Sequence, residues 1–196
     1  MNSLLQNLAS YEVILASKSP RRQQLLADMG IPFTVLTKDT DESFPADLPA
    51  AEIASYLSRV KAEAFSANEL PANFLLITAD TVVVKEQLPL NKPENRAEAV
   101  TMLQTLSGCT HEVITGITIR SRHKLVSFAE ISEVTFDVLE EDEIDFYVNR
   151  HKPFDKAGAY GIQEWIGVIG ISGMHGSFYN VMGLPTHTLY QALKSF

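Results

Sequence analysis

VILASKSPRR, residues 13–22, is the stretch that decides the fold, because it joins a buried strand directly to a helix. The apolar run at 13–16 is typical of a buried strand. Ser19 is a favoured helix cap and Pro20 is favoured at the first helical position, so we predict that a helix begins there. Apolar residues then recur at helical spacing, and Gly30 is suited to end the helix.

Outward from this stretch, strand-like and helix-like patterns are intermixed. We predict further strands at 31–36, 74–78, 81–84, 111–120 and 125–138, and further helices at 50–67, 95–106, 140–149 and 185–193. Ala79-Asp80 is expected to interrupt the apolar pattern between 74 and 84. There is no internal repeat and no linker, so the fold class is α/β or α+β with a mixed sheet.

Composition and charge limit the kinds of partner that the protein can have. The chain has 196 residues, of which 45% are hydrophobic, which suits one globular domain with a substantial core. A formal net charge of −8 argues against a polynucleotide partner, although a local basic pocket could still hold one small polyanion. The single Cys109 leaves no intramolecular disulfide. No apolar run approaches the ~20 residues needed to cross a bilayer, and residues 1–11 lack signal-peptide features, so we expect a cytoplasmic protein.

The helix start at 17–22 combines two hydroxyls, three cations and the free N–H groups of a helix N-terminus. Such a combination favours an anion, because arginine forks and backbone N–H groups both bind phosphate oxygens. The alternative is a capped helix whose basic residues are merely solvated, and the pattern alone leaves both open.

Two acidic features could meet a cation. The loop at 39–42 carries Asp39, Asp41 and Glu42, and oxygen ligands of this kind suit Mg²⁺, although such loops are usually only solvated. Asp80 stands inside an apolar strand pattern, where a carboxylate is costly unless it meets a cation or donors such as Thr78 and Thr81. The alternative for Asp80 is a structural bulge.

The segment 154–163 supplies glycines that let a backbone approach a ligand, together with polar groups. Gln163 could read a base edge through its amide, or the segment could be a tight loop packed on the core. Lys92 stands in a loop shortly after Asp80. The phosphate loop G-x-x-x-x-G-K-[ST] and the dinucleotide motif G-x-G-x-x-G are both absent from the sequence.

Taken in order, these clusters resemble the Maf family of nucleotide pyrophosphatases. The matching pieces are LASKSPRR at 15–22, DES at 41–43, ADTVV at 79–83, KP at 92–93, TG at 115–116, DKAGAYGIQ at 155–163 and NVMGLP at 180–185. Each piece is moderately specific, whereas the ordered set is highly specific.

The resemblance implies a two-lobed α/β domain at 12–196, preceded by an N-terminal extension at 1–11. The domain should have a mixed twisted sheet and a central nucleotide cleft, similar to the inosine triphosphate pyrophosphatases. The implied activity is hydrolysis of a nucleoside triphosphate to the monophosphate and pyrophosphate with Mg²⁺ or Mn²⁺, as house-cleaning of the nucleotide pool. Arg22, Thr81 and Gln163 match the branch that acts on dTTP and UTP, and modified pyrimidine nucleotides are further candidates.

The resemblance also implies roles for individual residues. Asp80 matches the catalytic proton acceptor, and Asp80 with Glu42 would hold the metal. The expected substrate-binding residues are Ser17, Arg21, Arg22, Lys61, Thr81, Lys92, Lys156 and Gln163. The chain departs from the family pattern in two places: Lys18 adds a cation near the phosphates, and Glu164-Trp165 stands where the branch often has Gly.

The implied partners are a small-molecule nucleotide and a second copy of the chain, with no polynucleotide and no membrane. The competing hypothesis is a non-enzymatic nucleotide-binding regulator of cell division or septum formation. Asp80 distinguishes the two hypotheses. A carboxylate that faces a polyphosphate repels it unless a metal lies between them, so a protein that only binds the nucleotide would gain little from it.

Overall fold

A mixed seven-stranded sheet organises the computed structural model of the chain, which describes residues 3–196. The strands are β1 (Glu12–Leu15), β2 (Thr34–Val35), β3 (Phe74–Lys85), β4 (Leu88–Leu90), β5 (Thr110–Arg120), β6 (Leu125–Phe136) and β7 (Ile171–His175). Their order is β2-β1-β3-β5-β6-β7, with β4 paired to β3. β1 runs parallel to β2 and β3, whereas β7 runs antiparallel to β6. The predicted mixed α/β class is confirmed.

Two compact units divide the chain. Unit 1 contains the residues up to Asp80 together with 115–130 and 183–196, and unit 2 contains 81–114 and 131–182. The division falls inside β3, β5 and β6, so each of these strands contributes residues to both units. Asp80 is therefore the last residue of β3 in unit 1.

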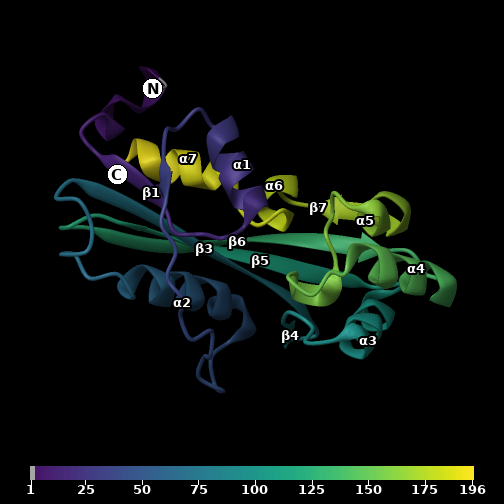
Figure 1. Cartoon of the computed structure of the whole chain (residues 1–196). Helices are drawn as coiled ribbons and strands as arrows, with labels where there is room; N and C mark the ends of the chain where they lie inside the picture. Colours follow the sequence, from purple (N-terminus) through teal and green to yellow (C-terminus); the bar gives the residue numbers. More distant parts are fainter. Residues whose placement is uncertain (1–2) are drawn as a thin grey trace. The chain divides into compact units, whose positions relative to one another are not determined.

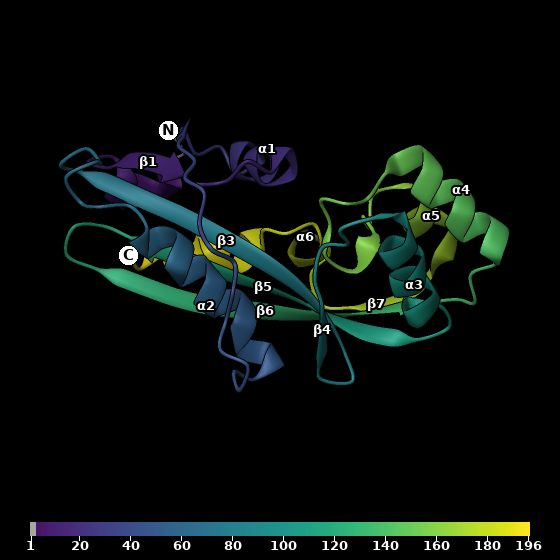
Figure 2. The ribbon, with the colours of Figure 1, turned by 60° about the horizontal axis from the view of Figure 1, so that its bottom comes forward.

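Unit 1 is a layered structure in which helices cover both faces of its strands. Its helices are the 3-10 helix η1 (Ser3–Leu8), α1 (Pro20–Asp28), α2 (Ala50–Glu63) and α7 (Thr186–Lys194). In Figures 1 and 2, α2 lies on one face, and α1 and α7 lie on the other. A strand covered on both faces reads as a continuous apolar run, which explains the unbroken burial of β3 from Phe74 to Asp80.

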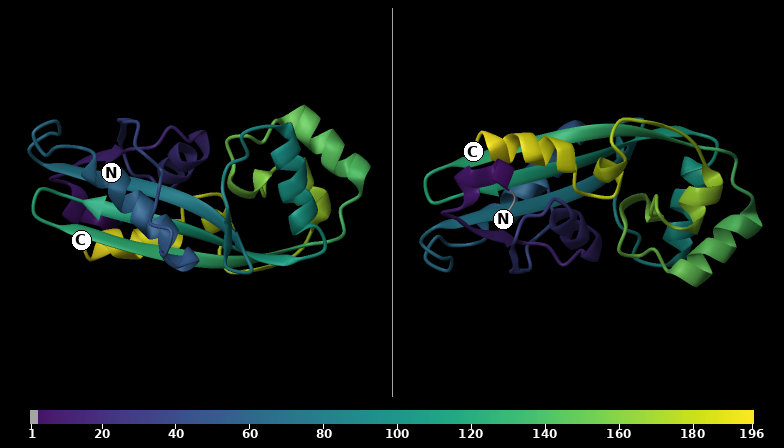
Figure 3. Two further views of the ribbon diagram at one scale, coloured as in Figure 1. Left: turned by 90° about the horizontal axis from the view of Figure 1, so that it is seen from below. Right: turned by 90° about the horizontal axis from the view of Figure 1, so that it is seen from above.

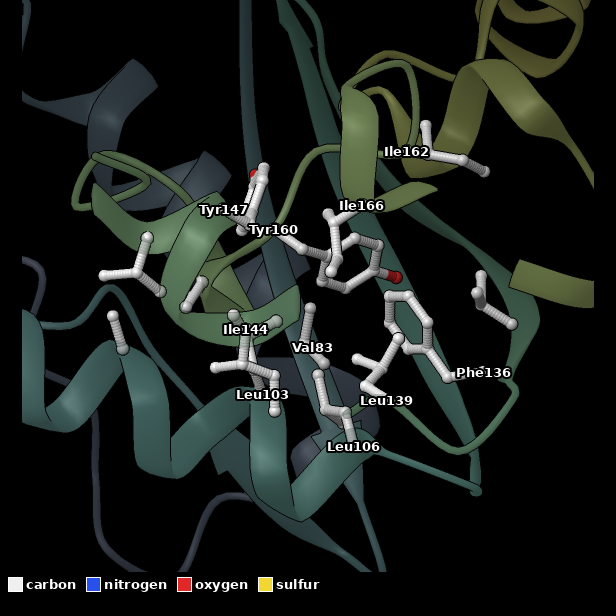
Figure 4. Packing of buried hydrophobic residues seen from close by; sticks show 14 of the residues in the cluster. Val83, Leu103, Leu106, Phe136, Leu139, Ile144, Tyr147, Tyr160, Ile162 and Ile166 are labelled. Atoms are coloured by element: carbon white, nitrogen blue, oxygen red, sulfur yellow. The ribbon is translucent and has the colours of Figure 1, made fainter. Parts of the chain in front are cut away.

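Unit 2 gathers its helices around an aromatic core. They are α3 (Arg96–Leu106), α4 (Glu141–His151), the 3-10 helix η2 (Ala157–Ala159), α5 (Trp165–Gly170) and α6 (Phe178–Val181). Figure 4 shows Phe136, Tyr147 and Tyr160 packed among aliphatic side chains of this core. The predicted cap of α3 is present, because the Asn95 side chain accepts from the backbone N–H of Glu98 at 3.1 Å.

Several predicted elements differ from the structure, and β4 and η1 were not predicted. β3 continues through Ala79-Asp80, where an interruption was expected, and Asp80 is accommodated by an ion pair described below. β2 contains only Thr34 and Val35, and both are exposed. The glycine-rich stretch after Pro153, for which no regular element was predicted, contains η2, α5, β7 and α6.

The first and last helices of unit 1, η1 and α7, contact each other. Of the expected extension at 1–11, the first two residues lie outside the described part, and Leu5 and Leu8 of η1 are buried. The Asn7 side-chain amide donates to the carbonyl oxygen of Leu193 at 2.7 Å, which attaches η1 to α7 (Figure 3). Within residues 3–196, no helix is long and apolar enough to cross a membrane.

Candidate active site

A lysine between two carboxylates forms the charged centre of unit 1. Lys61 Nζ pairs with an Asp80 carboxylate oxygen and lies 2.8 Å from Glu42 Oε1. The Asp80 residue is 6% exposed, so its charge needs a partner close by, which Lys61 supplies. The structure thus brings together three residues that the sequence analysis named separately: Asp80 of the strand, Glu42 of the loop and Lys61 of the helix.

The position of Lys61 depends on how α2 is attached to the sheet. Thr78 Oγ1 donates to the Ser58 carbonyl oxygen at 2.6 Å, and the hydroxyls of Ser58 and Thr118 lie 2.9 Å apart. These contacts fix α2 to β3 and β5 one helical turn before Lys61. The position of Thr78 in the sequence suggested that its hydroxyl would donate to Asp80. In the structure this hydroxyl donates to α2 instead.

Gly116 lets α2 lie this close to the sheet. A Cβ at Gly116 would come within 2.2 Å of the Ala54 carbonyl carbon and oxygen. No side-chain-bearing residue fits at that distance, because carbon atoms pack at about 3.5–4.0 Å. The glycine is therefore required for the approach of α2, and through α2 for the contact of Lys61 with Asp80.

Arg22 connects α1 to the strand that carries Asp80. Its Nε donates to the Gly183 carbonyl oxygen at 2.7 Å, and its Nη1 donates to the Ala79 carbonyl oxygen at 2.9 Å. Burial lowers the pKa of the Arg22 guanidinium, and the Asp80 carboxylate opposes this change. A guanidinium stays protonated in proteins, so Arg22 places a permanent positive charge beside the acidic centre.

The start of α1 has the predicted geometry. Ser19 caps the helix by accepting from the backbone N–H of Arg22 at 3.4 Å, and Pro20 occupies the first turn. Ser17 is buried, and its Oγ accepts from the backbone N–H of Ser19 at 3.2 Å. Arg21 is half-buried beside it. The backbone N–H groups and the basic side chains of this turn belong to the same unit as Lys61 and Asp80.

The three acidic residues of the loop at 39–42 have different partners. Asp41 accepts from the backbone N–H and the hydroxyl of Ser43, both at 2.9 Å, and these bonds lower its pKa. Asp39 pairs with Lys18 at 2.6 Å, and both side chains are largely exposed, so this pair contributes little. Lys18, expected near the phosphates, is therefore engaged by Asp39. Glu42 is the loop acid that joins Lys61.

Unit 2 holds the remaining predicted substrate residues. Thr81 is half-buried in β3, Lys92 is exposed in the loop after β4, and Gln163 is exposed after η2. Lys156 is only 7% exposed. Its Nζ lies 2.7 Å from Asp155 Oδ1 and 3.2 Å from Glu164 Oε1.

Sequence reasoning missed one polar partner of this segment. The Tyr147 hydroxyl donates to a Glu164 carboxylate oxygen and accepts from the backbone N–H of Gly161 at 3.2 Å. Tyr147 follows the apolar spacing of α4, so it looked like an ordinary core residue. The available signal was Glu164, which stands where the resembling branch often has Gly.

Asp80 and Glu42 are the residues that could hold a divalent cation in unit 1. In the described part of the chain, no three His, Cys, Asp or Glu side chains gather into a metal site. Asp80 and Glu42 both contact Lys61 Nζ, and two carboxylates of this kind would suit Mg²⁺ or Mn²⁺, which keep several waters and accept phosphate oxygens as further ligands. They do not suit zinc, whose structural sites use four protein ligands, mainly Cys and His.

A family model described as Maf-like protein matches residues 12–196. The chain belongs to the Maf family. A relative in Bacteroides thetaiotaomicron, named dTTP/UTP pyrophosphatase, is 52% identical over 192 residues, covering 97% of this chain and 99% of that protein. Relatives with the same name in Porphyromonas gingivalis and Parabacteroides distasonis are 50% and 49% identical, each over 98% of this chain and over 98% and 100% of those proteins. The resemblance read from the motifs is confirmed.

Proposed function

We propose that this Maf-family chain hydrolyses dTTP and UTP to the monophosphate and pyrophosphate, and so removes unwanted nucleotides from the pool. One observation carries the proposal: a buried strand carboxylate, Asp80, is paired with Lys61 and acts electrostatically on the nearby guanidinium of Arg22. The same activity is named for relatives that are about half identical over nearly the whole chain.

The triphosphate should be held by the cations and helix N-terminus of unit 1. A polyphosphate carries several negative charges. The start of α1 offers it hydrogen-bond donors with positive charge or partial positive charge, namely the backbone N–H groups, Arg21 and Arg22. Ser17 and Lys61 add a hydroxyl and an ammonium. From unit 2 we propose Lys92 and Lys156 as further phosphate-binding groups.

Asp80 is the proposed catalytic base. Its carboxylate can accept a proton from a water and direct that water at the phosphorus atom whose bond to the pyrophosphate leaving group breaks. Lys61 pairs with Asp80 and orients its carboxylate, while the arginines stabilise charge on the departing pyrophosphate. A divalent cation held by Asp80 and Glu42 would supply Lewis-acid stabilisation of phosphate oxygens.

Selection of the base is proposed for Gln163, with Thr81 and Arg22. The amide of Gln163 offers a donor and an acceptor together, which suits the acceptor-and-donor edge of uracil and thymine. Cytosine presents the reverse donor and acceptor order on that edge, so the amide prefers UTP over CTP only when its own orientation is fixed and it cannot flip. Modified pyrimidines that keep this edge are further candidate substrates.

A nucleotide panel tests the proposal. Purified protein is incubated with dTTP, UTP, CTP, ATP and GTP in the presence of Mg²⁺, and pyrophosphate and orthophosphate are measured separately. We expect pyrophosphate from dTTP and UTP at rates well above the others. Orthophosphate as the main product, or no release from any nucleotide, would refute it.

We also propose that the enzyme works as a homodimer in the cytoplasm, where the nucleotide pool lies, with 12–196 as its catalytic domain. Val168 and Ile169 of α5 are 75% and 43% exposed, and Phe146 of the neighbouring α4 is 46% exposed. Exposed apolar side chains on two neighbouring helices favour a protein partner. Light scattering of the wild type and of Val168→Asp measures the effect: a dimer that the substitution dissociates is expected.

A further inference from the structure

The Tyr147 hydroxyl contacts both ends of one short turn. It accepts from the backbone N–H of Gly161 at 3.2 Å and donates to the carboxylate of Glu164. The turn is closed by the backbone N–H of Glu164, which donates to the Gly161 carbonyl oxygen at 2.9 Å. Gln163 projects from this turn and is exposed. One buried phenol therefore holds the ends of the segment that presents an exposed amide.

The other carboxylate oxygen of Glu164 extends this arrangement to Lys156. Glu164 Oε1 lies 3.2 Å from Lys156 Nζ, and Asp155 Oδ1 lies 2.7 Å from the same atom. The Lys156 and Glu164 side chains are 8% and 20% exposed, so this pair is poorly screened by solvent. Three N–H donors are available on an ammonium, which leaves capacity for a substrate oxygen.

Two further observations show that the turn is built around Glu164. A Cβ at Gly161 would come within 2.9 Å of the Glu164 carboxyl carbon, so the glycine makes room for the carboxylate. Burial and the bond to Glu164 raise the pKa of Tyr147 far above its ordinary value. The phenol therefore keeps its proton and acts as a donor at any physiological pH.

We propose that Tyr147 and Glu164 are positioning residues that fix the Gln163 turn and Lys156 for recognition of the pyrimidine nucleotide. This inference rests on the proposed base-reading role of Gln163. Neither residue touches the reacting atoms in this assignment: Tyr147 holds the turn, and Glu164 joins the turn to the lysine. Glu164, at a position where the family branch often has Gly, thus acquires a definite role.

Tyr147→Phe and Glu164→Gln test the inference, with Tyr160→Phe as the matched control. Tyr160 is the other large phenol of this core, and its hydroxyl lies 2.8 Å from His111 Nε2. In Figure 4 the hydroxyls of Tyr147 and Tyr160 point in different directions. Each Tyr→Phe change removes one buried hydroxyl from the same core, so both should lower thermal stability similarly, and a kinetic difference reports on the turn.

For Tyr147→Phe and Glu164→Gln we expect KM for UTP to rise about tenfold while kcat changes less than about threefold, because ground-state positioning is lost and the chemical step is not. Preference for UTP over CTP should fall by a similar factor. Tyr160→Phe should leave both quantities within about twofold. Hydrogen exchange of the amides at 161–164 should become faster in the first two variants, and not in the control.

A double-mutant cycle with Gln163→Ala separates this inference from the proposed function. If Tyr147 acts through Gln163, adding Tyr147→Phe to Gln163→Ala changes UTP preference no further. If Gln163→Ala alone leaves the preference unchanged, the base-reading role is wrong. If Gln163→Ala lowers the preference but Tyr147→Phe and Glu164→Gln do not, the positioning role is wrong while the proposed function stands. Should Tyr147→Phe fail to fold, Glu164→Gln carries the test.

Discussion

Gly116→Ala should damage both the stability and the activity of the enzyme. The added Cβ would lie 2.2 Å from the Ala54 carbonyl group of α2, so α2 must move by about 1.3–1.8 Å to reach an ordinary contact of about 3.5–4.0 Å. Overpacking of this kind costs about 1–3 kcal/mol. For a chain of this length, that lowers the melting temperature by roughly 3–10 °C.

The kinetic loss should exceed what the stability loss explains, because α2 also carries Lys61. Displacing the helix moves the ammonium relative to Asp80 and Glu42, and a misplacement of about 1 Å near a catalytic group can lower the rate by ~10²-fold. Differential scanning calorimetry gives the melting temperature. Pyrophosphate release from UTP, measured at least 15 °C below the transition, gives kcat and KM for the folded protein.

Gly173→Ala is the matched control. Gly173 also lies in a strand, but a Cβ there would be 3.6 Å from Thr135 Cβ, which is an ordinary contact. This variant should melt within about 2 °C of the wild type and keep its kcat. The reasoning is refuted if Gly116→Ala behaves like Gly173→Ala, because α2 would then absorb the extra carbon without moving Lys61.

Three other predictions concern charge and protonation. Asp80→Asn should keep the fold and lower kcat by ~10²-fold or more; near-normal turnover would remove Asp80 from its role as base. Chelation of divalent cations by EDTA should abolish pyrophosphate release, and added Mg²⁺ or Mn²⁺ should restore it; activity that survives chelation argues against the proposed metal. Burial, with Lys85 adding to it, lowers the pKa of His111 to about 4, while an unfolded histidine titrates near 6.5. The unfolded chain therefore binds the extra proton between these values, so stability is complete above about pH 6.5 and falls by roughly 2–3 kcal/mol as the pH drops to about 4. Denaturant titrations of wild type and His111→Gln check this, since the variant should lose that part of the pH dependence.

Local chemistry predicted the helices and strands well where one rule dominates. The start of α1 followed from Ser19-Pro20, and the start of α3 followed from the side chain of Asn95. The predicted interruption of the strand at Ala79-Asp80 was wrong. The ion pair that accommodates Asp80 in β3 is made with Lys61, which local sequence rules do not connect to it. The small elements between Pro153 and Pro185 escaped prediction for a similar reason: their backbone is fixed by tertiary contacts.

The candidate site divides in the same way. The types of its residues could be read from motifs, since a carboxylate in an apolar strand and cations at a helix start are unusual in themselves. Which of these residues pair with one another could not be read from the sequence, because the pairing depends on the approach of α2 at Gly116 and on the hydrogen bonds made by Thr78. Tyr147 itself gave no sequence signal, because a tyrosine at core spacing in a helix usually signals packing; Glu164, where the family branch often has Gly, was the indirect signal.

Arg22 links the choice of substrate to the stability of the fold. Arg22, which we propose takes part in pyrimidine recognition, also donates to the carbonyl oxygens of Ala79 and Gly183. Replacing it would leave those oxygens without a strong donor, which costs about 1–3 kcal/mol for a buried group. A lineage that altered position 22 to accept another base would therefore lose stability at the same step. New specificity in this family should then follow, rather than precede, stabilising substitutions elsewhere in the chain.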